Sequence, residues 1–198
     1  AVGSDNRTAT YTSGDNSTDL VFRYTIQAGD TDSDGISIRA NALDNNSSTI
    51  RDRAGNIATD LTHSAVSDNN GYIVDTTPPT VSSVAITSAT NKQYSFVNAD
   101  DVVSVTATFN EAFPSAVIVD NTSAATLTMV VGSTNRTAAY YEGSNITPSV
   151  NDNSSLVFRY TIQANGTSGE NDDDGISIVA DALNSNIITI RDAAGNIA

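Results

Sequence analysis

The stretch LVFRYTIQ occupies residues 20–27 and returns unchanged at residues 156–163. Leu, Phe, Tyr and Ile fall at every second position within it. This period of two predicts a β-strand with one face in a hydrophobic core. Each copy is followed by an acidic turn, by DGISI and by a closing stretch of the form TIRDxAGNIA. The chain therefore repeats one β-rich unit.

The repeat extends upstream of this strand, because VGS and NRTA recur within residues 2–9 and 131–138. One period covers about 140 residues, whereas the units of solenoid proteins are about 20–50 residues long. A unit of this length can bury a core of its own. We therefore expect each repeat to be a self-contained domain, with neighbouring repeats of the same protein as its partners.

The two copies are incomplete in different ways. Residues 1–75 form the back portion of a repeat and lack the front strands that residues 80–130 add to the second copy. Residues 76–198 form a repeat without its last strand, the counterpart of GYIVD at residues 71–75. The two prolines of DTTPP fix φ and remove backbone donors, so we expect a stiff border near Thr76. The chain is expected to be a window of a longer repetitive polypeptide.

Short alternating segments dominate the rest of the chain. The clearest covers residues 103–109, where Val, Val, Ala and Phe alternate with Ser, Thr and Thr. Helical periodicity is limited to single turns at residues 40–43 and 180–183. Short strands separated by Asn, Asp and Gly turns predict an all-β fold of antiparallel, immunoglobulin-like β-sandwiches. Phe22 and Tyr24 of the repeated strand are expected to lie in the core.

The composition excludes several classes of protein. A net charge of −14 and a pI near 4.1 argue against binding to nucleic acid, which needs a basic surface. The same charge argues against attraction to anionic membranes. No apolar run is long enough for membrane insertion, since a spanning helix needs about 20 apolar residues. The sequence contains no Cys, so disulfides are excluded.

Catalysis finds little support in the sequence. His63 is the single histidine, has no copy in the second repeat and is expected to be a surface residue. The chain contains neither a Cys nucleophile nor a G-x-S-x-G motif, which are common signatures of nucleophilic catalysis. The acidic pairs recur with the repeat, whereas a catalytic site would be expected once. We therefore predict that the protein is not an enzyme.

The clearest chemical motif is the turn DTDSDG at residues 30–35. Carboxylates at alternate positions converge when the chain curls, the glycine permits the sharp turn, and such oxygen ligands suit Ca²⁺. The alternative is a solvated acidic β-turn, because Asp and Gly favour turns without a metal. The predicted Ca²⁺ ligands are Asp30, Asp32 and Asp34 in the first copy and Glu170, Asp172 and Asp174 in the second.

A second predicted calcium site lies at the joint between repeats. Asp75 precedes the Pro-Pro segment, and we expect the loops that carry Asp52, Asp100 and Asp101 to lie near it at one end of a sandwich. A cation shared by these four residues would lock two domains together, and clustered carboxylates repel one another without a cation. The alternative is that Asp52 only caps its own turn.

Four segments together resemble the immunoglobulin-like repeats of giant secreted bacterial surface proteins, which include large adhesins and biofilm proteins. They are DTTPPTVSSVAI, VVSVTATFNE, LVFRYTIQ with its acidic turn, and the IRDxAGNIA close. The resemblance covers essentially the whole chain. It implies tandem domains on the extracellular cell surface that act in cell adhesion as rigid spacers, with calcium at the joints.

Open strand edges in both copies allow a different function. Strands exchanged between identical chains would make the protein a subunit of a self-assembling extracellular filament. The overlap between the two copies favours the array, because a polymer subunit would more naturally contain each strand once. A sugar-binding module would need an exposed aromatic platform, and the sequence offers no clear one.

Overall fold

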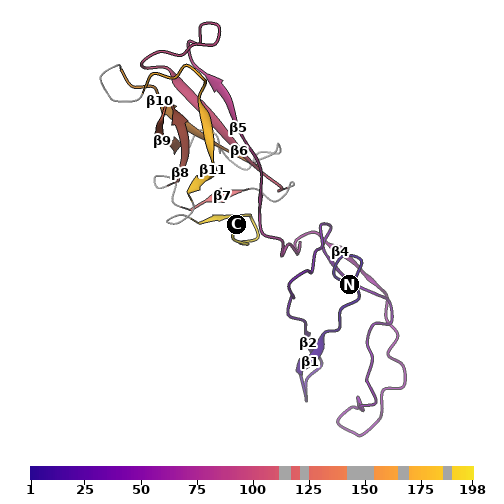
Figure 1. The fold of residues 1–198 in the computed structure, drawn as a ribbon. Coiled ribbons are helices and arrows are strands. Elements are labelled where there is room, and N and C mark those ends of the chain that lie inside the picture. The colour runs from indigo at the N-terminus through magenta and orange to yellow at the C-terminus, as the bar shows by residue number, and fades with distance from the viewer. Residues whose placement is uncertain (112–116, 121–124, 142–153, 165–169, 185–188) are drawn as a thin grey trace. The chain divides into compact units, whose positions relative to one another are not determined.

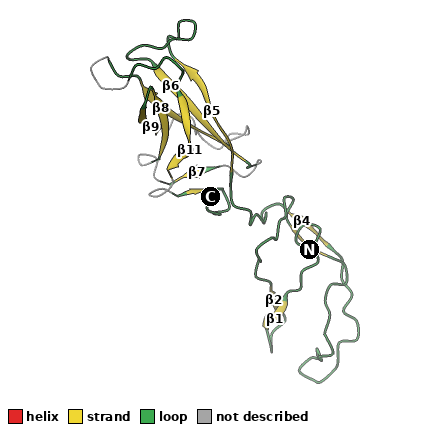
Figure 2. Ribbon diagram, in the orientation of Figure 1, coloured by secondary structure: helices red, strands yellow, loops and turns green. Residues whose placement is uncertain are grey.

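The computed structural model describes residues 1–111, 117–120, 125–141, 154–164, 170–184 and 189–198. The chain divides into two compact units, Ala1–Thr77 and Pro78–Ala198. Each unit is built from antiparallel β-strands, as Figures 1 and 2 show. Within the described ranges, no helix is long and apolar enough to cross a membrane.

The second unit contains a six-stranded antiparallel sheet that curls into a half-barrel. Its strand order is β11-β8-β9-β10-β6-β5 (Figure 1). A separate two-stranded sheet pairs β7 (Ile118–Val119) with β12 (Ile190–Arg191). The strands of the large sheet are β5 (Val81–Ala89), β6 (Val102–Phe109), β8 (Thr126–Val131), β9 (Thr134–Tyr140), β10 (Ser155–Thr161) and β11 (Ser177–Asn184).

The core of the second unit follows the alternation seen in the sequence. Every second residue of β6 and β8 is buried, and β10 adds Leu156 and Phe158, which are both fully buried. Strand β10 pairs with β6 so that Leu156 faces Ala107 and Phe158 faces Val105. Burying each large apolar side chain contributes about 1.5–3 kcal/mol. The strands predicted from the two-residue period are confirmed in the described part of this unit. Residues 180–183, where helical periodicity was limited to a single turn, belong to β11.

The first unit has two small sheets. One pairs β1 (Thr10–Ser13) with β2 (Val21–Arg23), and the other pairs β3 (Ile36–Ile38) with β4 (Val66–Asn69). Residues 40–43, the other place where helical periodicity was limited to a single turn, are not helical either.

The repeated strand has a different environment in the two units. Phe22 is 38% exposed, whereas its counterpart Phe158 is 0% exposed. Leu20 and Leu156 differ in the same way, at 40% and 0%. The expectation that Phe22 lies in a core is therefore wrong for the first copy. The physical reason is that no strand equivalent to β6 pairs with β2 among residues 1–77.

The contact between two aromatic side chains on neighbouring strands is nevertheless the same in both copies. Tyr11 faces Phe22 across β1 and β2, and Tyr140 faces Phe158 across β9 and β10. Both pairs meet edge to face with ring centroids 5.9 Å apart.

The segment GYIVD at residues 71–75 was expected to be the last strand, and this expectation is wrong. The strand lies earlier, at β4, and residues 71–75 contribute only an isolated bridge. In that bridge the Asp32 N–H donates to the Val74 carbonyl at 2.7 Å, and the Val74 N–H donates back to the Asp32 carbonyl at 2.9 Å. The acidic turn is therefore tied to the end of the first unit.

Candidate metal centre and acidic turns

Two carboxylates of the second unit approach each other closely. Glu111 follows the end of β6, and Asp192 follows β12. One carboxylate oxygen of Glu111 lies within 4.8 Å of one carboxylate oxygen of Asp192. Ca²⁺ binds oxygen ligands at about 2.3–2.6 Å, so two ligands of one ion can lie up to about 5 Å apart. The pair thus has a spacing at which a single cation can bind both groups.

Asp192 is held rigidly by its own turn. Its side chain is 0% exposed. The Asn196 N–H donates to Asp192 Oδ1 at 2.8 Å, and the Asn196 side-chain amide donates to Oδ2 at 2.7 Å. A carboxylate offers about four lone-pair sites, so these two bonds leave acceptor capacity for a cation.

The corresponding turn of the first unit has the same hydrogen bonds. Asn56 donates from its backbone and its side chain to the two oxygens of Asp52, each at 2.8 Å. These donors, the Asn56 side chain first, lower the pKa of Asp52. Asp52 therefore caps its own turn, as the alternative interpretation of this residue predicted.

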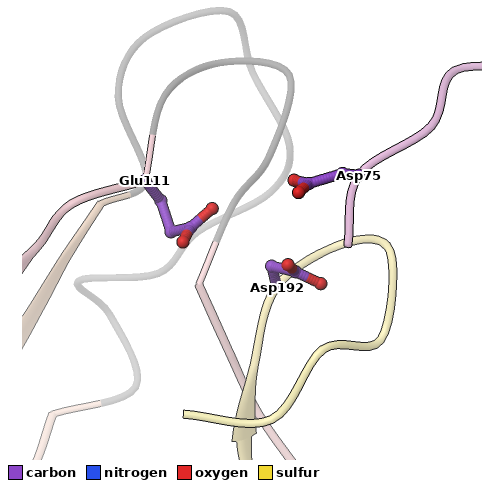
Figure 3. Close-up of side chains that lie close together, drawn as sticks. All are labelled: Asp75, Glu111 and Asp192. Carbon is purple, nitrogen blue, oxygen red and sulfur yellow. The ribbon is translucent and has the colours of Figure 1, made fainter. Parts of the chain in front are cut away.

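Figure 3 shows Glu111 and Asp192 and also labels Asp75. Asp75 belongs to the first unit and precedes its last residue, Thr77, by two positions. The Thr77 N–H donates to Asp75 Oδ1 at 2.9 Å.

Asp100 and Asp101 lie at the opposite end of β6 from Glu111. Asp101 is buried, and its carboxylate accepts a bond of 2.7 Å from the Asn98 N–H. The backbones of Asp100 and Asp101 bond to Ile162 at the end of β10. The eight residues of β6 span about 26 Å at about 3.3 Å per residue. The second unit therefore does not bring Asp100 and Asp101 together with Glu111 and Asp192.

The acidic turn of the first unit forms a buried network of protein donors. Asp30 is 2% exposed. Its Oδ1 accepts a bond of 2.7 Å from Arg7 Nε, and its Oδ2 accepts bonds from the Tyr24 hydroxyl at 2.6 Å and the Gln27 N–H at 2.8 Å. The Gln27 N–H, the Tyr24 hydroxyl and the Arg7 guanidinium together lower the pKa of Asp30.

The second carboxylate of this turn is satisfied by backbone groups. Asp32 is 3% exposed and accepts from the Gly3 N–H at 2.6 Å and the Gly35 N–H at 2.7 Å. These donors lower the pKa of Asp32. Gly3 lies in the two-residue turn that follows Val2. Asp32 thus links the turn at residues 2–5 to the acidic turn at residues 30–35.

The second copy repeats this network with a glutamate in place of Asp30. Glu170 forms an ion pair of 2.5 Å with Arg136 and accepts a bond of 2.8 Å from the Tyr160 hydroxyl. Burial and the Glu170 bond raise the pKa of Tyr160 to about 12. Asp172 accepts from the N–H groups of Gly132 and Gly175 at 2.8 and 2.7 Å. Burial opposes ionisation of Asp172, but these donors lower its pKa.

These contacts limit the capacity of the acidic turns to bind a cation. In each copy the first carboxylate meets an arginine, and the second is held by two backbone N–H groups. A cation would have to share these oxygens with the protein donors. Asp34 and Asp174 are exposed at the tip of each turn. Calcium binding at the six predicted turn residues stays a prediction, and the contacts show that protein donors already bond to the first two carboxylates of each turn.

The network also anchors the start of the joint in the first unit. The Gly29 N–H donates to the Thr76 hydroxyl at 2.9 Å, and that hydroxyl donates to the Asp30 carbonyl at 3.0 Å. The linker therefore leaves the first unit from a fixed point beside the buried Asp30.

Sequence reasoning missed two residues of the site and the contacts of His63. Glu111 and Asp192 are 81 positions apart, so no local spacing could reveal their proximity, although Asp192 is the repeat counterpart of the predicted Asp52. His63 is half-buried, and its Nε2 accepts bonds of 2.8 and 3.3 Å from the N–H groups of Ala42 and Leu43.

Comparison of the chain with protein-family models, with curated proteins and with solved structures found no match.

Proposed function

We propose that this protein is a structural repeat of an extracellular surface protein, in which tandem immunoglobulin-like sandwiches form a stalk that calcium stiffens at the joints. One observation carries the proposal. The buried acid, arginine and tyrosine contacts recur in both copies of the repeat, with Asp30, Arg7 and Tyr24 matched by Glu170, Arg136 and Tyr160. A network that recurs with the repeat is what a scaffold needs in every module.

The short linker supports a restricted joint. Thr76 is bonded to the first unit through Gly29 and Asp30. In the second unit, the Thr80 N–H donates to Asn110 Oδ1 at 2.7 Å, and the Asn110 N–H donates to the Thr80 carbonyl at 2.9 Å. Only residues 77–79 lie between these anchors, and two of them are prolines, which resist bending.

The same anchors limit how far Asp75 can lie from Thr80. Asp75 is five residues before Thr80, and an extended chain of five residues reaches at most about 17 Å. Thr80 is bonded to Asn110, the neighbour of Glu111. We propose that Glu111 and Asp192 of the second unit bind calcium beside the joint, and the joint site predicted at Asp75, Asp100, Asp101 and Asp52 stays a prediction.

A bound cation would stabilise the Glu111–Asp192 pair by electrostatic attraction. Two ionised carboxylates whose oxygens lie within 4.8 Å of one another repel by at least about 3 kcal/mol at an effective dielectric constant of about 20. A divalent cation replaces this repulsion with attraction to both groups, and a third ligand from the other side of the joint would remove rotational freedom. Extracellular calcium modules work with dissociation constants of about 10⁻⁴–10⁻³ M, which suits a surface protein.

Thermal unfolding of the full chain with Ca²⁺, with Mg²⁺ and with chelator tests this proposal. Binding only to the folded state at about 100 times the dissociation constant adds about 2.7 kcal/mol, a shift of several degrees. Glu111→Gln should abolish the calcium-specific shift. Asp100→Asn is the matched control, because it removes a carboxylate at the other end of β6, and it should leave the shift intact. Equal shifts with Ca²⁺ and Mg²⁺, or a full shift in Glu111→Gln, would refute the assignment.

A further inference from the structure

The segment that connects β5 to β6, residues 90–101, carries two aromatic side chains on the surface of the second unit. Tyr94 is 95% exposed and Phe96 is 73% exposed. They are the most exposed of the large hydrophobic side chains that the structure describes. Single apolar residues scattered over a surface are ordinary, but two aromatic rings within three residues of one another need an explanation.

A tight hairpin turn brings the two rings to one place. The Gln93 N–H donates to the Phe96 carbonyl at 3.0 Å, and the Phe96 N–H donates back to the Gln93 carbonyl at 2.9 Å. Tyr94 and Ser95 are therefore the two residues of the loop. Consecutive Cα atoms lie about 3.8 Å apart, so the Cα atoms of Tyr94 and Phe96 are at most about 7.6 Å from each other.

The base of this hairpin is fixed to the packed part of the unit. The Thr90 N–H donates to the Val102 carbonyl at 3.0 Å, and the Val102 N–H donates to the Thr90 hydroxyl at 2.7 Å. On the other side, Val97 is half-buried and packs against the hydrophobic core. The Asn98 N–H donates to the Asp101 carboxylate at 2.7 Å. The hairpin is thus preorganised, which limits the conformational entropy that it would lose on binding a partner.

Tyr94 has an unfavourable backbone conformation for its residue type. Its φ is +55°, in the left-handed region, where the Cβ atom of a bulky residue costs free energy. Two-residue hairpin loops with a positive φ at their first position favour glycine there. Asn91 and Asp100 of the same segment also have a positive φ, of +48° and +72°, but Asn and Asp tolerate this region. Backbone strain of this kind is concentrated at functional sites, so the tyrosine at this position indicates a binding role.

The polar side chains around the two rings limit the kind of partner. Asn91, Lys92, Gln93 and Ser95 are all exposed, and they offer amide, ammonium and hydroxyl groups to a ligand. Lys92 is the only lysine of a chain whose net charge is −14. This net charge repels anionic polymers and anionic membranes. A partner that is rich in hydroxyl groups and carries no net charge therefore fits the hairpin best.

We infer that the hairpin at residues 91–96 is a binding site for neutral polysaccharides. An aromatic ring has a negative face, which attracts the partly positive C–H groups on the apolar face of a sugar ring. Tyr94 and Phe96 provide two such faces, and the exposed amides of Asn91 and Gln93 can bond to sugar hydroxyl groups. Sugar binding adds a function to the proposed stalk and does not rest on it.

The sequence alone did not reveal this exposed aromatic platform. Tyr94 and Phe96 are separated by a single residue, which is also the spacing of core residues in a strand. Only the structure distinguishes the two cases, because it places both rings on a turn rather than in β5 or β6.

Affinity electrophoresis of the full chain tests this inference, because the negative net charge drives the protein through a native gel. We expect dextran, galactomannan or soluble starch in the gel to retard the chain. Tyr94→Asn accepts the left-handed backbone with less strain, so it should bind at least about tenfold more weakly without a lower melting temperature. Phe96→Ala should also weaken binding. The matched control is Tyr72→Ala, which removes a 66% exposed tyrosine of the first unit and should be retarded like the parent.

Two further measurements separate a neutral sugar from other partners. Lys92→Glu reverses the charge beside the rings and should be retarded like the parent, whereas a large loss would indicate an anionic ligand. Vesicles of phosphatidylcholine should not bind the chain, and vesicle binding that depends on Tyr94 would replace the sugar with a membrane. The inference is overturned by either result, by no retardation in any of the three gels, or by equal retardation of Tyr94→Asn and the parent. Gels run in chelator keep this test independent of the calcium proposal.

Discussion

Phe158 and Phe22 occupy the same position of the repeat and provide a direct comparison of burial. Phe158 is 0% exposed and contacts Tyr140, whereas Phe22 is 38% exposed. Phe158→Ala should destabilise the second unit by about 3–5 kcal/mol, the range for a buried phenylalanine. For a unit of about 120 residues, this corresponds to a fall in its melting temperature of about 12–20 °C.

Phe22→Ala should cost only about 1 kcal/mol, the scale of its edge-to-face contact with Tyr11. Hydrogen exchange read by mass spectrometry assigns each loss of stability to its own unit, while circular dichroism gives the melting temperature. The reasoning would be refuted if Phe22→Ala destabilised the first unit as much as Phe158→Ala destabilises the second. That result would mean that a partner buries β2 in solution.

Three further predictions follow from the turns. The pKa of Asp172 lies below its ordinary 3.8. Its contribution to the free energy of unfolding is therefore present above pH 3.8 and is lost as pH falls through the lowered pKa. The melting temperature between pH 5 and pH 2 should fall less steeply in Asp172→Asn than in the parent chain. The pKa of Tyr160 is raised to about 12, so its contribution to folding stability is lost as pH rises through that value. In Tyr160→Phe, the ultraviolet titration of the tyrosines should lack its last step. Gly35→Ala should speed hydrogen exchange in β4, whereas Gly55→Ala, also at positive φ but in open space, should not.

The alternation of apolar residues predicted β6, β8 and β10 of the second unit because each of these strands has a core on one side. Residues 103–109 and β6 agree almost completely. The same pattern at residues 20–27 gives only the three residues of β2. Alternation predicts which face of a strand can be buried, but burial also needs neighbouring strands. Residues 1–77 provide β1 as a partner of β2 but no equivalent of β6.

The acidic turns show why spacing alone could not predict their contacts. The sequence places three carboxylates on one turn, but the donors that hold Asp30 come from Arg7 and Tyr24, which are 23 and 6 positions away. The recurrence of an arginine and a tyrosine beside each acidic turn, at Arg136 and Tyr160 in the second copy, was the available signal. The Glu111–Asp192 pair had no such signal, because only tertiary structure brings it together.

The distance between spin labels on the two units, measured with and without Ca²⁺, tests the stiffened joint most directly. The chain has no Cys, so Thr18→Cys and Ser83→Cys provide unique labelling sites on exposed positions of the first and second units. We predict that Ca²⁺ narrows the distance distribution and that Glu111→Gln prevents this narrowing, while Mg²⁺ has little effect. A distribution that is equally broad with Ca²⁺ and with chelator would contradict a calcium-stiffened stalk.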